Sequence, residues 1–425
     1  MEVGDIAKLA EEQQARETAN DPLVKKMFDI VRAFIQTHRV MCYGGTAINN
    51  LLPREDQFYD PEVDIPDYDF FSETPQLHAA SLADKLVEAG FKSVEAKPGV
   101  HLGTFKVFCD YIGVADISHM DKSMFEKIWK DSVLKDDIHY VSPNFLRMAV
   151  YLELSRPKGD VSRWKKVYDR LQLLNKHYPI TCPASEEKLD DEYLTEKVRK
   201  DIKKLLIKEK VILLGFNASM LQGAKKSNKW MLPLDILTTP ERMSEIAHKI
   251  KNFFGNHEKV SIHEHPAYEE YLPASTDISD KGNTLVRIYE TTACHSYHST
   301  RSGLMVASIP TLLQFFFALV YSPREFSDKV PEQRLLCTAE HLVNLANDNS
   351  ARRHKILTPI TCLGKQKSLV DMRVERSELF QKLSEDKTSR EFLEYFFEYR
   401  PSQMTKTVRR RTREMLRKTL KNRRR

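Results

Sequence analysis

The chain has 425 residues, with 66 Lys and Arg against 60 Asp and Glu for a net charge of +6, and 41% of its residues are hydrophobic. This length and apolar fraction predict two or three domains with packed cores, and they exclude a collagen, a mucin-like stalk and a wholly disordered chain. The longest apolar stretch, Leu312–Tyr321, is far shorter than the roughly 20 residues of a membrane span. It predicts a buried helix instead, and we expect a soluble, intracellular protein that has no membrane contact.

Helical and extended patterns alternate in the first part of the chain. The predicted elements are a helix over 21–35, a strand over 39–43, a glycine turn over 44–46 that opens a helix to residue 52, a polar loop over 54–66, a strand over 67–71, a helix over 76–89, strands over 104–111 and 113–118, and helices over 142–154 and 162–174. The two-residue period of a strand places Asp67 and Asp69 on one face. This mixture predicts an α/β or α+β fold.

The second half repeats part of this order. A strand over 211–214 enters Gly215, and the segment Leu214–Ala218 aligns with Tyr43–Ala47. A following strand over 232–237 has one acid, Asp235, where the first half has two, and a strand over 285–292 and a helix over 309–321 come later. We therefore expect an internal duplication whose second copy has lost its metal ligands. The predicted domains are residues 1–185, 186–375 and 376–425, the last a helical segment with a basic tail.

Basic residues gather at the carboxyl end. Residues 408–425 hold ten Lys or Arg and one acid, 10 − 1 = +9, which leaves +6 − 9 = −3 for the other 407 residues. Such a block binds phosphates where it meets nucleic acid, and it is otherwise a solvated or nuclear-targeting tail. The residues that we predict to bind RNA are Arg409, Arg410, Arg411 and Arg413.

The six cysteines lie far apart, and none of them forms a CxxC pair. They are Cys42, Cys109, Cys182, Cys294, Cys337 and Cys362. This spacing argues against a disulfide framework and against a cysteine zinc site. We expect reduced, small core residues.

One set of residues has a chemistry of its own: Gly44, Gly45 and Thr46 at a helix start, Asp67 and Asp69 on one strand, and Asp116 on a later strand. Glycines allow the backbone to approach a triphosphate, and a helix start presents unpaired amide groups to it. Converging carboxylates stay ionised only with cations between them, and hard oxygen ligands suit Mg²⁺ or Mn²⁺. Two such ions, about 3.5 to 4 Å apart, clamp the entering and leaving oxygens of an in-line displacement. Each part is a weak signal alone, but together they predict a metal-dependent nucleotidyltransferase site.

The segments Tyr43–Ala47, Asp64–Ser72, Ala115–Ser118, Leu152–Pro157 and Asp160–Arg170 also resemble a known family. They look like the DNA polymerase β type nucleotidyltransferase superfamily, and most of all like the catalytic poly(A) polymerases of large DNA viruses such as mimivirus, African swine fever virus and poxviruses. The resemblance implies an α/β (α+β) fold. Its first domain would be a polymerase β-like nucleotidyltransferase domain with a helical extension, and its second a degenerate nucleotidyltransferase-like domain.

The same resemblance implies a function. ATP would be the donor and the 3′ hydroxyl of mRNA the acceptor, with two Mg²⁺ or Mn²⁺ ions held by the catalytic residues Asp67, Asp69 and Asp116. The residues implied to bind the nucleotide are Gly44, Gly45, Thr46, Ser162, Arg163 and Lys166. For Arg163 and Lys166 the alternative to nucleotide binding is that they lie on a solvated face of a helix. The resemblance also implies a homodimer, located in the host cytoplasm at the viral factory and in the virion.

Two alternatives stay open. The first is a uridylyl or CCA-adding transferase, because no residue in the sequence indicates which nucleotide base is selected. The second is an inactive relative that binds RNA as a scaffold. The gap from Gly45 to Asp67 is longer than in most of the superfamily, which makes Asp64 a second choice for the first carboxylate. We choose Asp67, because a residue three positions away does not share its strand face with Asp67.

Overall fold

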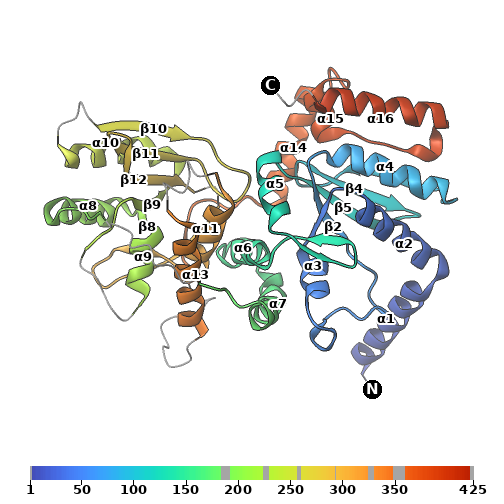
Figure 1. Ribbon diagram of the computed structural model, residues 1–425, viewed down its shortest axis with the longest axis horizontal. Coiled ribbons are helices and arrows are strands. Elements are labelled where there is room, and N and C mark those ends of the chain that lie inside the picture. Colours follow the sequence, from blue (N-terminus) through green and yellow to red (C-terminus); the bar gives the residue numbers. More distant parts are fainter. Residues whose placement is uncertain are drawn as a thin grey trace. The chain divides into compact units, whose positions relative to one another are not determined.

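The computed structural model describes residues 2–182, 192–223, 229–255, 260–291, 293–323, 330–347 and 359–421. Contacts divide the chain into two compact units, residues 1–142 with 368–425, and residues 143–367 (Figure 1). The helices α6 (Pro143–Leu154) and α7 (Trp164–His177), expected as an extension of the first domain, belong to the second unit, because α6 packs against α11 (Ile309–Tyr321). These contacts divide the chain at 142 and 367 rather than at the expected 185 and 375, and residue 185 lies outside the described residues.

A mixed sheet is the centre of the first unit, with the strand order β3-β4-β5-β2-β1-β7-β6. The strands are β1 Met41–Tyr43, β2 Asp69–Ser72, β3 Val94–Pro98, β4 Thr104–Cys109, β5 Ile112–His119, β6 Val133–Lys135 and β7 Ile138–Tyr140. The pairs β2–β5 and β1–β7 are parallel, and the other neighbours are antiparallel. The helices are α1 Val3–Asn20, α2 Pro22–Thr37, α3 Gly44–Leu51, α4 Pro75–Glu88, α5 Lys122–Lys130, α14 Leu369–Leu383, α15 Arg390–Phe396 and α16 Lys406–Lys421.

Local sequence explains where α2 begins. The Asp21 side chain accepts hydrogen bonds from the backbone N–H groups of Leu23 and Val24, and Pro22 occupies the first helical turn. Capping of this kind satisfies amide groups that have no partner within the helix. The apolar face that the sequence predicts is buried, with Met27, Phe28, Val31, Phe34 and Ile35 in the core. The helix α1, by contrast, buries Ala19 alone and was not predicted, because it has no continuous apolar face.

The second unit repeats the topology of the first. Its sheet has the order β10-β11-β12-β9-β8-β14-β13-β15, and its first seven strands pair with the same directions as the seven strands of the first sheet. The strands are β8 Ile212–Leu213, β9 Leu234–Thr238, β10 Val260–His265, β11 Ser275–Asp280, β12 Asn283–Glu290, β13 His295–Ser299, β14 Met305–Ala307 and β15 Cys362–Leu363. The remaining helices of this unit are α8 Glu196–Glu209, α9 Gly215–Gln222, α10 Met243–Lys251 and α13 Glu332–Asn347. The expected internal duplication is therefore present in the fold.

The helix α11 confirms the prediction of a buried apolar helix. Ser308 caps it, and Pro310 lies in its first turn. Apolar side chains cover nearly all of its faces and are buried, as the core of a domain requires. Over the described part of the chain, every helix is too short or too polar to cross a membrane.

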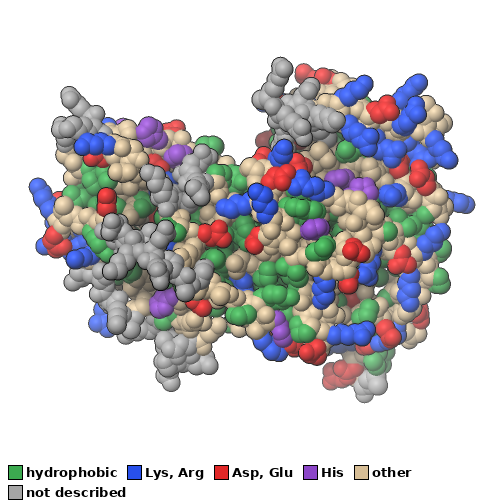
Figure 2. Space-filling view, viewed as in Figure 1, with side chains coloured by type: hydrophobic (Ala, Val, Ile, Leu, Met, Phe, Trp, Pro, Cys, Tyr) green, Lys and Arg blue, Asp and Glu red, His purple; other side chains and the backbone are tan. Residues whose placement is uncertain are grey.

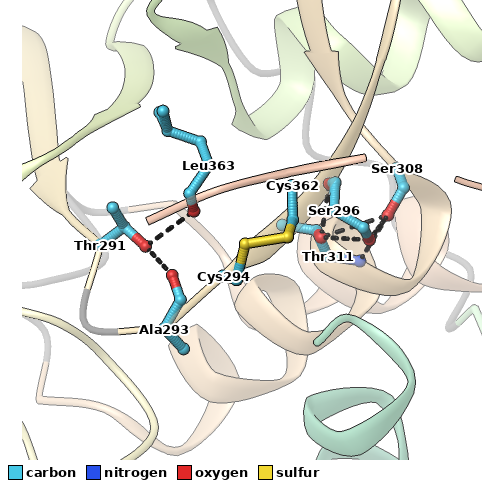
Figure 3. The surroundings of a disulfide bond; sticks show 8 residues. All are labelled: Thr291, Ala293, Cys294, Ser296, Ser308, Thr311, Cys362 and Leu363. Carbon is cyan, nitrogen blue, oxygen red and sulfur yellow. Dashed lines mark hydrogen bonds between the residues drawn. A yellow bond between two sulfur atoms is a disulfide. The ribbon is translucent and has the colours of Figure 1, made fainter. Parts of the chain in front are cut away.

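The expectation of six reduced cysteines is wrong for four of them. Disulfides join Cys182 to Cys337, and Cys294 to Cys362, across 155 and 68 positions. The fold brings the Cα atoms of these pairs to 4.4 and 5.1 Å, within the range that a disulfide spans, and spacing along the chain does not reveal such approaches. Figure 3 shows the second bond, in which Cys362 belongs to the short strand β15, and β15 pairs with β13. Cys42 and Cys109 are free and buried, as expected.

Candidate nucleotidyltransferase site

The glycine turn lies between β1 and α3. Gly44 has a φ of +72°, a conformation that glycine adopts without strain. A Cβ atom at this position would lie 2.8 Å from Oδ2 of Asp69, so the Asp69 side chain would have to shift for any other residue. Gly45 and Thr46 complete the first turn of α3, which has no acidic side chain. The turn therefore brings the backbone close to the carboxylate of Asp69.

Register brings two of the three predicted carboxylates together. Asp69 is paired with Tyr43 across β1–β2 and with Asp116 across β2–β5. Because opposed residues on neighbouring strands point to the same face, the side chains of Asp69 and Asp116 lie side by side next to the glycine turn. Burial and then the charge of Asp69 raise the pKa of the neighbouring Cys42 thiol, so this thiol stays protonated and unreactive.

Asp67 lies two residues before Asp69, just outside β2, and is exposed. The Thr46 hydroxyl donates a hydrogen bond of 2.6 Å to the Asp67 carbonyl oxygen. Thr46 therefore anchors the segment that carries Asp67, and its hydroxyl is engaged in the protein rather than directed to a phosphate. The alternative residue, Asp64, belongs to a turn in which its carboxylate accepts a hydrogen bond of 2.9 Å from the Asp60 N–H. The choice between Asp67 and Asp64 stays a prediction.

A residue that the sequence did not suggest completes the site. Lys106 on β4 is paired in register with Asp116, and its ammonium group makes an ion pair with the Asp116 carboxylate. The strand over 104–111 was predicted, and Lys106 is one of its outward-facing residues. The only signal for it was therefore the two-residue alternation of that strand, which does not identify the partner strand.

The donor set fits a hard divalent cation by its chemistry and its register. Asp69 and Asp116 offer carboxylate oxygens on one face, with Asp67 at its edge, and such oxygens are the ligands that Mg²⁺ and Mn²⁺ prefer. Among the described residues, no three His, Cys, Asp or Glu side chains converge as the ligands of one metal ion. Asp116 is turned to Lys106 instead. The backbone therefore places the predicted ligands Asp69 and Asp116 next to each other. Their side chains must turn before they can bind a cation together.

Three further residues predicted to bind the nucleotide lie in the second unit. Ser162 is in a short 3-10 helix, where its N–H donates to the carboxylate of Asp160 at 3.2 Å. Arg163 lies 3.4 Å from Glu153. Burial raises the pKa of the Glu153 carboxyl group, and the charge of Arg163 offsets part of this rise. Lys166 is exposed on α7. Their assignment to the nucleotide stays a prediction.

The basic carboxyl end forms the helix α16, which packs against α4 (Figure 1). Arg409 and Arg413 face the protein, where they lie 3.3 and 2.7 Å from the carboxylate oxygens of the buried Asp84. The prediction that these two residues contact RNA is therefore corrected, because their guanidinium groups bind Asp84. Arg410 and Arg411 are exposed on the outer face of α16, where Lys and Arg side chains gather in Figure 2.

The fold is a mixed sheet with a glycine turn and paired carboxylates at its centre, followed by a second sheet of the same topology. The crystal structure of the Megavirus polyadenylate synthase matches it with a TM-score of 0.79, over 98% of this chain and 88% of that chain, at 21% identity. The fold class predicted from the sequence is confirmed.

Sequence comparisons show which proteins this chain is similar to. Residues 29–160 match the model of the poly(A) polymerase catalytic subunit family. The poly(A) polymerase catalytic subunit of African swine fever virus (isolate Pig/Kenya/KEN-50/1950) is 34% identical over 173 residues, 39% of this chain and 36% of that relative. That of Acanthamoeba polyphaga mimivirus is 23% identical over 301 residues, 63% of this chain and 51% of the relative. The chain thus spans about a third of the first relative's length and half of the second's. The resemblance to viral poly(A) polymerase catalytic subunits is confirmed.

Proposed function

We propose that this chain is a template-independent poly(A) polymerase that adds AMP from ATP to the 3′ hydroxyl of mRNA. The observation that carries the proposal is the register pair of Asp69 and Asp116 beside the Gly44 turn. In the reaction the RNA 3′ oxygen bonds to the α-phosphorus, the bond from that phosphorus to the bridging oxygen breaks, and pyrophosphate leaves with the electron pair. The proton of the hydroxyl passes to water.

Each part of the site has a role in this reaction. Asp69 and Asp116, with Asp67 at the edge, would hold two Mg²⁺ or Mn²⁺ ions, which supply positive charge for the phosphates and lower the pKa of the attacking hydroxyl. The backbone N–H groups of Gly45 and Thr46 at the start of α3 would donate to the triphosphate. Gly44 keeps the backbone close to Asp69, so a phosphate bound at the helix start would lie near this carboxylate. Thr46 holds the Asp67 segment in place.

A nucleotide assay tests the activity. The purified chain is incubated with a labelled RNA, Mg²⁺ or Mn²⁺, and each of the four NTPs in turn. We expect extension with ATP, and little with the other three. Extension with UTP would indicate a uridylyl transferase. Addition of CCA when CTP and ATP are supplied together would indicate a CCA-adding transferase. The absence of product under every condition would favour an RNA-binding scaffold.

The outer face of α16 is our candidate for guiding RNA. Its exposed basic residues include Arg410, Arg411, Arg417 and Lys418, with Glu414 as the acid among them. Arginine and lysine bind the phosphate backbone by charge, without reading sequence. Removing residues 408–425 would also remove Leu416 and the inward arginines from the first unit. Substitutions on the outer face alone are therefore the sharper test.

Changing those four outer residues to Gln is expected to weaken RNA binding and its salt dependence. Four lost phosphate contacts should flatten the slope of log K against log salt by about 3 for single-stranded RNA. Fluorescence anisotropy of a labelled RNA at several salt concentrations measures the slope. The matched control removes four exposed lysines from α8: Lys197, Lys200, Lys204 and Lys208. Equal slopes for the two variants would contradict a specific role of α16.

The homodimer, the host-cytoplasmic location and presence in the virion remain predictions from the resemblance. The solution mass of the purified chain, measured by light scattering, tests the first of these. A mass near 49.4 kDa would contradict a dimer, because this is the mass of one chain.

A further inference from the structure

Four charged side chains lie in one row across the first sheet. Lys97 on β3 is opposite Lys106 on β4, which is opposite Asp116 on β5, and Asp116 is opposite Asp69 on β2. Directly opposed residues of neighbouring strands point to the same face of a sheet. The two lysines therefore continue the row of carboxylates on the face of the proposed site.

Within this row, Lys106 and Lys97 have different partners. The ammonium group of Lys106 pairs with Asp116, a predicted metal ligand, whereas that of Lys97 pairs with Glu95 on its own strand. The two lysines are about equally exposed, at 40% and 43%. The Asp116 side chain is 27% exposed, so the ion pair is partly open to solvent.

The second sheet has the same cross-strand pair with its charges exchanged. Asp277 on β11 and Arg287 on β12 stand where the first sheet has Lys106 and Asp116, and Asp235 on β9 stands in the place of Asp69. Arg287 donates two hydrogen bonds of 2.7 Å to Asp277. These two side chains are 2% and 5% exposed, so this pair is closed to solvent. The pair of the first sheet differs in being open to exchange.

We propose that Lys106 is a positioning residue that exchanges partners during the reaction, an inference that rests on the proposed function. Before the nucleotide binds, Lys106 holds the Asp116 carboxylate and neutralises one of the adjacent negative charges. When ATP and its cations enter, Lys106 releases Asp116 and turns to the phosphates of the nucleotide. No proton is transferred in this exchange.

Electrostatics explains why the exchange is favourable. Carboxylates held side by side repel each other, and a positive partner relieves the repulsion. An ammonium group that stays beside bound divalent cations is itself repelled by them. A triphosphate brings negative oxygens to the same face and offers the lysine a new, charge-assisted partner. One movable side chain therefore lowers the net negative charge of the empty site and of the loaded site.

Direct measurement of Mn²⁺ binding tests this role without relying on polymerase activity. The signal of free Mn²⁺ in electron paramagnetic resonance gives the affinity of the wild type, Lys106→Met, Lys106→Arg and Lys97→Met, without nucleotide. We expect Lys106→Met to bind Mn²⁺ about tenfold more tightly, because a positive charge that competes at Asp116 is lost. The same variant should bind α,β-methylene-ATP with Mg²⁺ about tenfold more weakly, because a charged phosphate contact is lost.

The other variants separate the role of Lys106 from a general effect of charge. Lys106→Arg should restore both affinities towards wild type, and Lys97→Met should change neither, because its partner is Glu95. Circular dichroism checks folding, and Lys106→Gln takes the place of Lys106→Met if the latter unfolds.

Unchanged or weaker Mn²⁺ binding by the folded Lys106→Met or Lys106→Gln variant would overturn the exchange. Failure of the proposed function has a different result: the wild type would then bind Mn²⁺ no better than Asp69→Asn, and the inference would fail with it. If the wild type needs Asp69 for Mn²⁺ binding and Lys106 has no influence, only the inference fails.

Discussion

Asp69→Asn is expected to lower the rate of RNA extension with ATP by about 10³-fold or more, because metal ligation contributes several kcal/mol to the transition state. The substitution keeps the size of the side chain, so the close approach to Gly44 is unchanged. It removes the negative charge from the residue that lies between the glycine turn and Asp116. Single-turnover extension of a labelled RNA, at saturating ATP and Mg²⁺, measures the chemical step.

The duplicated fold offers a matched control for this experiment. Asp235 has the same place in the second sheet, and a Cβ atom at Gly215 would meet its carboxylate as one at Gly44 would meet that of Asp69. Asp235→Asn should leave the extension rate unchanged, because the neighbouring position on β12 is Arg287 rather than a carboxylate. Thermal unfolding of both variants shows that each is folded. Activity of Asp69→Asn close to that of the wild type would remove this residue from the site.

Much of the fold could be predicted because its signals are local. The strand, glycine turn and helix over Met41–Leu51 are adjacent in the chain, and the apolar faces of α2 and α11 follow the helical period. The repeat was visible for the same reason: Leu214–Ala218 matches Tyr43–Ala47 over a few positions, and both glycines adopt a positive φ.

Features that depend on pairing between distant segments could not be predicted. The ion pair of Lys106 with Asp116 requires the register of β4 against β5, and the exchanged pair in the second sheet requires a strand, β11, that the sequence did not suggest. The disulfides join cysteines 155 and 68 positions apart. Spacing along the chain has no information about such contacts, so the thiols were expected to be reduced.

The carboxyl end shows that the number of basic residues in a segment does not say which of them are exposed. The sequence established a basic block, and the helical period divides it into two faces. The division could be foreseen in part, because Leu416 lies on the same face as Arg409 and Arg413. That this face would be the inward one depends on Asp84, more than 300 positions away. A charge run therefore indicates a polyanion-binding surface only after its buried members are identified.

The inward arginines lead to the second large effect, on stability. Asp84 on α4 is 2% exposed and is bound by Arg409, by Arg413 and by the hydroxyl of Tyr399, which donates to it at 2.8 Å. The pKa of the Tyr399 phenol is raised by burial first and then by this hydrogen bond, so Tyr399 remains a donor at neutral pH. One carboxylate thus connects α4 to two segments of the carboxyl end.

Asp84→Ala is expected to destabilise the first unit by about 3–5 kcal/mol, the usual cost of removing one partner from a buried ion pair. The cost arises because Arg409, 7% exposed, would keep Glu88 at 3.7 Å as its one acidic partner among the described residues. Glu88→Gln is the control: this side chain is 55% exposed, and loss of such a pair costs about 1 kcal/mol or less. Urea unfolding of the first unit is monitored through the hydrogen exchange of α4 and α16, which mass spectrometry measures. Equal protection of α16 from hydrogen exchange in the two variants would contradict this prediction. It would mean that apolar packing around Leu416, rather than the carboxylate of Asp84, holds this helix on the first unit.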